Sequence, residues 1–133
     1  MKLTISYHLE ENRFTLYVEM TNDTDKDRTF YFYNETGGLA RNAVRFFNAK
    51  NEQVEPYERS FMSPIYTGED VPADLLAPRE TGHFELPAKI VEEDGELLLS
   101  FKGISYRIVR HEKFYLTFNF LGGISNLLEV VVV

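Results

Sequence analysis

The chain has 133 residues and a formal net charge of −7, from 14 Lys and Arg residues against 21 Asp and Glu residues. This length is that of one domain with one hydrophobic core, and a hydrophobic share of 44% excludes a disordered chain. The acidic balance disfavours nucleic acid, whose phosphates would be repelled, and favours a basic protein as partner. We therefore expect residues 1–133 to form a single domain that binds no nucleic acid.

Signals of the cellular compartment agree with one another. The chain has no cysteine, which excludes disulfides and is typical of a reducing compartment. His8 and Glu10 interrupt the N-terminus before an apolar run of signal-peptide length can form, and the four C-terminal valines are too few to span a membrane. The sequence therefore predicts a cytoplasmic protein without a membrane partner.

The first part of the chain has the pattern of strands joined by turns. Apolar residues alternate with polar ones over 3–9 and again over 14–20, which predicts an opening hairpin. Short strand patterns follow at 29–33 and 44–47, separated by a Gly-containing break at 34–38. No stretch of the chain shows a convincing helical period.

The middle of the chain has a different pattern. Four prolines punctuate residues 56–78 and no period is visible there, so we expect an irregular segment that is either functional or packed over the core. Strand patterns return at 81–86, at 90–101 around an Asp94-Gly95 hairpin turn, and at 105–110.

Residues 113–133 carry the strongest strand signal in the chain. Every second residue from Phe114 to Phe120 is apolar, which is typical of a strand with one buried face. Gly122-Gly123 then offers a two-residue hairpin turn, because glycine readily adopts the positive φ that such a turn needs. The returning segment ends in four valines and is apolar on both faces.

Together these elements predict an all-β fold. About eight to ten short strands, with turn signals about every ten residues, are typical of an antiparallel immunoglobulin-like β-sandwich. The residues expected in its core are the apolar members of the alternating segments: Phe14, Leu16, Val18, Phe84, Leu86, Leu116, Phe118 and Phe120.

The order of the elements resembles that of bacterial immunoglobulin-like domains, including the β-sandwich domain that precedes the catalytic part of deuterolysin-like metalloendopeptidases. The resemblance rests on strands that run into polar turns at 18–24 and 44–52, on Leu76-Ala-Pro-Arg-Glu80, and on the closing strand at 114–120. Arg79 stands where such domains usually have Gly. The chain also resembles a family of small intracellular proteinase inhibitors that has a similar β-sandwich. Both resemblances imply a fold more than a function.

No catalytic motif is recognisable in the sequence. His8, His83 and His111 each lack the second His one helical turn away that a zinc protease needs. A Gly-rich phosphate loop before a helix and a Gly-x-Ser-x-Gly nucleophile motif are also missing from the sequence. We therefore expect a protein that is not an enzyme, with no catalytic residues, no metal ligands and no cofactor.

One acidic segment has part of a calcium-binding pattern. Asp23, Asp25 and Asp27 alternate as at the start of a calcium loop, but Arg28 stands where the loop needs Gly and Asn34 where it needs a bidentate Glu. This segment has two interpretations. It is either a solvated turn between strands or a weak calcium site completed by another loop.

The surplus of aromatic residues is the strongest functional signal. Rings beyond those that one buried face requires suggest an interface, because surface aromatics contribute much of the energy of protein association. Phe61 and Tyr66 have an alternative role as a cap over an open end of the sandwich, and Tyr31 and Tyr33 could lie within a homodimer. The candidate partner-binding residues are Tyr31, Tyr33, Phe47, Phe61 and Tyr66.

Two functional hypotheses remain. The first is a protein-binding domain that acts by stoichiometric contact with a basic protein, as an inhibitor, an immunity protein or an assembly partner. The alternative is a small-ligand or carbohydrate-binding module that uses aromatic rings for stacking and is assisted by calcium. The absence of Trp disfavours this alternative.

Overall fold

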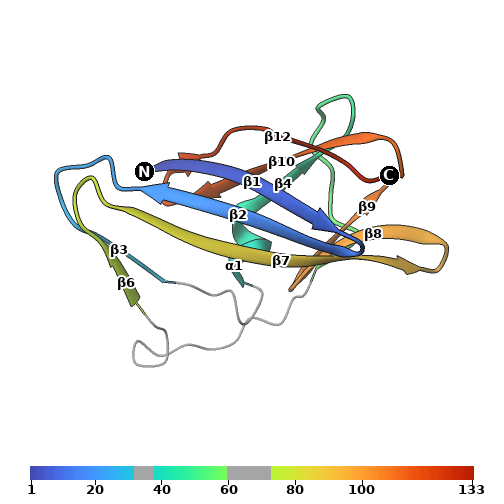
Figure 1. Cartoon of the computed structure of the whole chain (residues 1–133), viewed down its shortest axis with the longest axis horizontal. Coiled ribbons are helices and arrows are strands. Elements are labelled where there is room, and N and C mark those ends of the chain that lie inside the picture. Colours follow the sequence, from blue (N-terminus) through green and yellow to red (C-terminus); the bar gives the residue numbers. More distant parts are fainter. Residues whose placement is uncertain (32–37, 60–72) are drawn as a thin grey trace.

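The computed structural model describes residues 1–31, 38–59 and 73–133 (Figure 1). These residues are mostly in antiparallel strands, together with one short helix, α1 (Gly38–Ala43). The all-β, sandwich-like fold expected from the strand periodicity is confirmed. The helix was not expected, since its six residues are too few to show a helical period.

The larger sheet has six strands in the order β1-β2-β7-β8-β9-β5. Two-residue turns join β1 to β2, β7 to β8 and β8 to β9. Asp94 and Gly95 have φ values of 52° and 79°, so the hairpin turn predicted there is present. The strands are β1 (Lys2–Glu10), β2 (Arg13–Thr21), β5 (Glu58–Arg59), β7 (Thr81–Glu93), β8 (Glu96–Phe101) and β9 (Ile104–Ile108).

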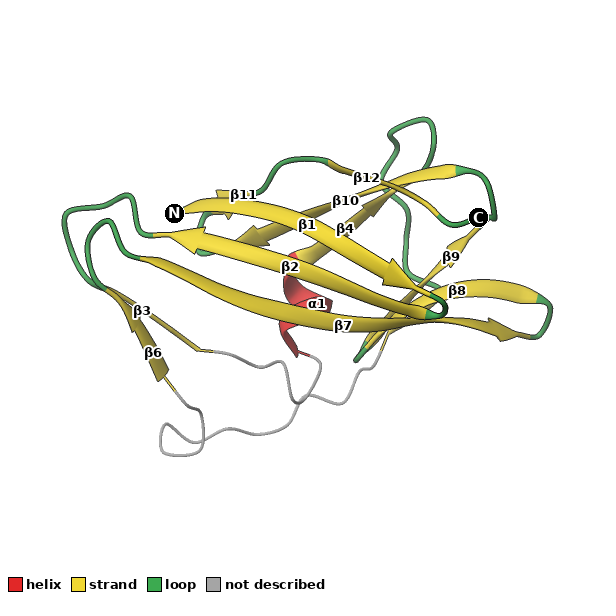
Figure 2. Cartoon of the chain, viewed as in Figure 1, coloured by secondary structure: helices red, strands yellow, loops and turns green. Residues whose placement is uncertain are grey.

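The smaller sheet is built around β10 (Lys113–Phe120). One edge of β10 pairs with β4 (Val44–Phe47), and the other pairs in turn with β11 (Gly123–Ile124) and β12 (Leu128–Val131). A separate ribbon of β3 (Arg28–Tyr31) and β6 (Ala73–Leu76) extends from the end of β2 and the start of β7. Figure 2 shows β10 and β4 crossing β1 and β2 at an angle.

Aromatic rings fill much of the space between the sheets. Phe84 on β7 meets Phe118 on β10, with ring centroids 5.6 Å apart. Phe46 on β4 stacks on Tyr106 at 4.8 Å and on Phe114 at 4.9 Å, which ties β9 to the smaller sheet. Of the predicted core residues, these are buried: Phe14, Leu16, Val18, Leu86, Leu116 and Phe118. The other two, Phe84 and Phe120, are only half-buried and pack against the core from its margin.

The C-terminal hairpin turns one residue earlier than the sequence predicts. Phe120 pairs with Gly123, so the turn residues are Leu121 and Gly122, with φ values of 51° and 78°. Gly123 serves a different purpose, because a Cβ on it would lie 2.5 Å from the backbone oxygen of Met1. The second glycine therefore lets β11 approach the start of β1 closely, a contact that local turn rules cannot show.

Replacing Gly123 with alanine should destabilise the protein by about 1–3 kcal/mol, because the clash is with backbone that cannot rotate away. Equilibrium chemical denaturation measures this loss. The matched control is Gly82→Ala, whose Cβ would meet only the Leu76 side chain at an ordinary 3.4 Å. Equal stability of the two variants would contradict the close approach of β11 and Met1.

The segment 56–78, expected to be irregular, contains the short strands β5 and β6. The strand expected at 81–86 also continues to Glu93, through Pro87. Proline is disfavoured in a central strand because it lacks an N–H donor, yet β7 continues through Pro87. The strand patterns at 44–47 and 105–110 correspond to β4 and β9.

Candidate interaction face

The outer face of the smaller sheet carries a cross-strand aromatic pair. Phe114, Leu116 and Phe118 on β10 point into the core, so the residues between them point outward. Tyr115 is one of these outward residues, and Phe47 on β4 lies directly opposite it. Both side chains are half-buried, so each keeps part of its ring in contact with solvent.

β11 and β12 add two apolar residues to this face on the other side of β10, where Glu129 lies opposite Tyr115. Ile124 lies opposite Asn119 and is 71% exposed, and Val131 lies opposite Lys113 and is half-buried. We refer to Phe47, Tyr115, Ile124 and Val131 as the outer apolar face. An ion pair between the Lys113 ammonium and the Glu129 carboxylate, 3.3 Å apart, gives this face its charged part.

The larger sheet has a different outer face. Tyr17 is the aromatic residue among the outward positions of β1, β2 and β7, and it is 37% exposed. The other outward positions on these strands are mainly polar: Thr4, Ser6, His8, Thr15, Glu19, His83, Glu85 and Lys89. The outer apolar face is therefore found on the smaller sheet alone among the described strands. Its residues are not part of the hydrophobic core.

A β-bulge separates β11 from β12 and links the two sheets. Ser125, Asn126 and Leu127 stand opposite two residues of β10, because Ile124 pairs with Asn119 and Leu128 with Leu116. The Asn126 side chain accepts a hydrogen bond from the Ile5 N–H at 2.8 Å and donates one to the Ile5 carbonyl at 3.1 Å. This amide occupies part of the β1 edge, and Leu127 beside it is 48% exposed.

Of the five predicted partner-binding residues, the structure places the side chain of Phe47 alone. Tyr31 ends β3 opposite Ala73, but its side chain lies outside the described residues. Tyr33, Phe61 and Tyr66 also lie outside them. Tyr115, Ile124 and Val131 were not among the predicted residues, although their segments have apolar or aromatic residues at positions opposite the expected core face.

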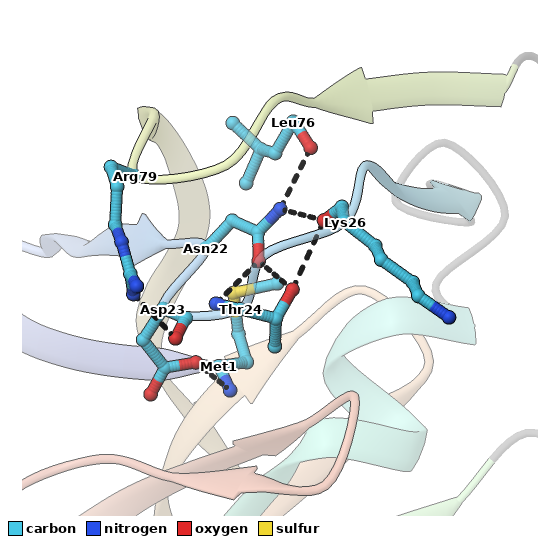
Figure 3. Close-up of polar contacts among 7 residues, drawn as sticks. All are labelled: Met1, Asn22, Asp23, Thr24, Lys26, Leu76 and Arg79. Atoms are coloured by element: carbon cyan, nitrogen blue, oxygen red, sulfur yellow. Dashed lines mark hydrogen bonds and ion pairs between the residues drawn. The ribbon is translucent and has the colours of Figure 1, made fainter.

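A buried asparagine forms the corner where β2 and β7 pass into the β3–β6 ribbon. The Asn22 side chain is fully buried, and its Nδ2 donates to the carbonyls of Lys26 at 2.8 Å and Leu76 at 2.9 Å (Figure 3). Its Oδ1 accepts from the N–H of Thr24 at 3.0 Å and from the Thr24 hydroxyl at 2.6 Å. One buried amide thus provides hydrogen-bond partners for backbone groups of both loops at the corner.

The acidic residues beside this corner are paired with cations. The Met1 ammonium lies 2.7 Å from the Asp23 carboxylate, and its hydrogen bond lowers the pKa of Asp23. The Arg79 guanidinium pairs with Asp25 at 3.1 Å and donates to the Asp23 carbonyl at 2.7 Å. Across residues 1–31, 38–59 and 73–133, no group of three or more His, Asp or Glu side chains is arranged to hold a metal ion.

Arg79 adopts the backbone conformation for which glycine would be expected. Its φ is 66°, and its N–H donates to the Asn22 carbonyl at 2.7 Å. The guanidinium contacts described above hold the residue in place, which offsets part of the cost of a positive φ for a side chain larger than glycine. The departure from the expected Gly is thus compatible with the turn.

Comparisons with known proteins assign no family. No protein-family model matches the chain, and no curated protein matches its sequence. The resemblance to bacterial immunoglobulin-like domains therefore stays a prediction. None of the helices within the described ranges has the length and apolarity required to cross a membrane.

Proposed function

We propose that the protein is a non-enzymatic binding domain that contacts another protein stoichiometrically through the outer apolar face. The observation that carries this proposal is the Phe47–Tyr115 pair, together with Ile124, on the side of the sheet that faces away from the core. Aromatic and branched apolar side chains in such a position gain free energy when a partner covers them.

Burial of this face by a partner contributes free energy to association. Full burial of an apolar side chain the size of isoleucine contributes about 1.5–3 kcal/mol, and Ile124 is 71% exposed in the free protein. Burial of the remaining surface of Tyr115 and Phe47 adds to this. The net charge of −7 favours a basic partner, which suits an inhibitor, an immunity protein or an assembly partner.

The partner could also be a second copy of this chain. β12 ends the smaller sheet as far as the structure describes it, so its outer edge can pair with an edge strand of another molecule. Sedimentation equilibrium of the purified protein separates the two cases, because a homodimer forms without any added partner.

The proposal is tested by capturing proteins from a lysate of the source cells, identifying the partner and titrating it in purified form. Wild-type protein should bind it with one-to-one stoichiometry, and the double variant Tyr115→Ala/Ile124→Ser should bind at least about tenfold more weakly. Unfolding midpoints of all variants establish that they remain folded.

Tyr17→Ala is the matched control, since it removes a half-exposed tyrosine from the outer face of the larger sheet. It should leave the affinity unchanged. The proposal fails if neither a partner nor self-association is found, or if Tyr17→Ala weakens binding while the double variant does not.

A further inference from the structure

A hollow of about 410 Å³ lies on the outer face of the larger sheet, where β2, β7 and β8 run side by side. This sheet is the one that does not carry the outer apolar face. The hollow is large enough for a small organic or inorganic ligand. Phe14, Pro87, Ala88 and Phe101 give it an apolar lining, and its polar lining residues are Arg13, Thr15, Lys89, Ser100 and Lys102.

The hollow exists because β8 leaves β7 at Pro87. The N–H of Ile90 points toward β2, where it donates to the Asn12 carbonyl at 2.8 Å. Backbone N–H groups alternate in direction along a strand, so the missing N–H of Pro87 falls on the side of β8. β8 ends at Phe101, opposite Ala88, and the chain turns away through Lys102.

Three cations surround this hollow on a protein whose net charge is −7. Arg13 and Lys89 are direct cross-strand partners, an arrangement in which like charges repel. Within the described residues, the ion pairs involve other cations and none includes Arg13, Lys89 or Lys102. On its other side Arg13 lies opposite Glu10 of β1, whose carboxylate is 3.7 Å from His8 Nε2.

The remaining polar groups of the hollow also suit an anion. No Asp or Glu lines it. The hydroxyl of Ser100 is hydrogen-bonded to that of Ser105 at 2.9 Å, and either hydroxyl can be the donor. If Ser105 is the donor, the Ser100 hydrogen can be donated to a ligand. The guanidinium of Arg13 can bind two oxygens of one oxyanion at once.

We infer that the hollow between β2, β7 and β8 binds a small, multiply charged oxyanion, a phosphate or polycarboxylate compound, through Arg13, Lys89 and Lys102. A bound oxyanion relieves the repulsion between Arg13 and Lys89 and supplies each of the three cations with a counter-charge. The site is independent of the proposed protein-binding face, because the two lie on different sheets.

The inference is tested by calorimetric titration of the full chain with inorganic phosphate, diphosphate and citrate, at an ionic strength held constant with sodium chloride. The three ligands separate phosphate compounds from carboxylates. At least one should bind saturably, and Lys89→Gln should weaken that binding by about tenfold. The unfolding midpoint of the wild type should rise with the ligand that binds.

Lys50→Gln is the matched control, because it removes the same charge from an exposed turn after β4. It should bind the oxyanion as the wild type does. Lys89→Gln should unfold at a midpoint equal to or above that of the wild type without ligand, since it removes the repulsion with Arg13. The inference is overturned if no ligand binds beyond the effect of chloride, or if Lys50→Gln weakens binding as much as Lys89→Gln.

Discussion

Replacing Phe118 with alanine is expected to lower the free energy of unfolding by about 3–5 kcal/mol. The Phe118 side chain is 0% exposed at the centre of β10. Its ring lies 5.6 Å from that of Phe84 on the opposite sheet and 5.7 Å from that of Phe120. Alanine would leave a cavity between the two sheets that these neighbours can fill only in part.

Equilibrium unfolding in guanidinium chloride measures the effect of Phe118→Ala. Phe47→Ala is the control, because it removes a phenylalanine from the outward side of the neighbouring strand, where burial is partial. It should cost clearly less than Phe118→Ala. An unchanged midpoint for Phe118→Ala would mean that the register of β10, and with it the assignment of Tyr115 to the outer face, is wrong.

The substitution Asn22→Asp should destabilise the protein by about 3 kcal/mol or more at neutral pH. The two side chains have the same shape, so packing is preserved. The change replaces the donor that Lys26 and Leu76 carbonyls require with an acceptor, and it buries a negative charge against two carbonyl oxygens. We expect this change alone to break the hydrogen bonds that hold the corner between β2 and β3.

The Asn22→Asp loss should depend on pH. Burial of the new carboxyl, with one of its oxygens against the carbonyls of Lys26 and Leu76, raises its pKa in the folded protein, while Thr24 still donates to the other oxygen. The penalty is therefore present above the raised pKa and shrinks as pH falls toward the unfolded value of the pKa. Asn12→Asp, in the exposed turn between β1 and β2, is the control with the same change in charge. A loss no greater than that of the control would show that the Asn22 amide is not needed at the corner.

Most of the strands could be predicted because their information is local. Alternation of apolar and polar residues marks β1, β2 and β10, and Asp94-Gly95 marks a hairpin turn. These signals depend on residues that are neighbours in the sequence. The packing of two sheets follows from them, since each strand has one apolar face to bury.

The features that the sequence did not reveal depend on contacts between distant segments. Gly123 is required by the backbone of Met1, and the Asn22 amide by the carbonyl of Leu76. Pro87 is tolerated within β7 because the neighbouring strand has already turned away. None of these pairs can be recognised without knowing which segments the fold brings together.

The candidate site was predictable only in part for a related reason. The sequence identified an aromatic surplus and placed Phe47 in it, but it could not assign a face to a segment that is apolar on both sides. Ile124 and Val131 belong to such a segment, and their outward position follows from their pairing with Asn119 and Lys113. Tyr115 looked like a member of the polar face of β10 because of its hydroxyl.

Amide hydrogen exchange of the protein, free and bound to its captured partner, shows which face binds. If the outer apolar face is the contact, binding slows exchange in β4, in β10 and from Ile124 to Val131, and leaves the β1–β2 hairpin unchanged. Slower exchange confined to β1, β2 and β7 would contradict the assignment and move the binding surface to the larger sheet.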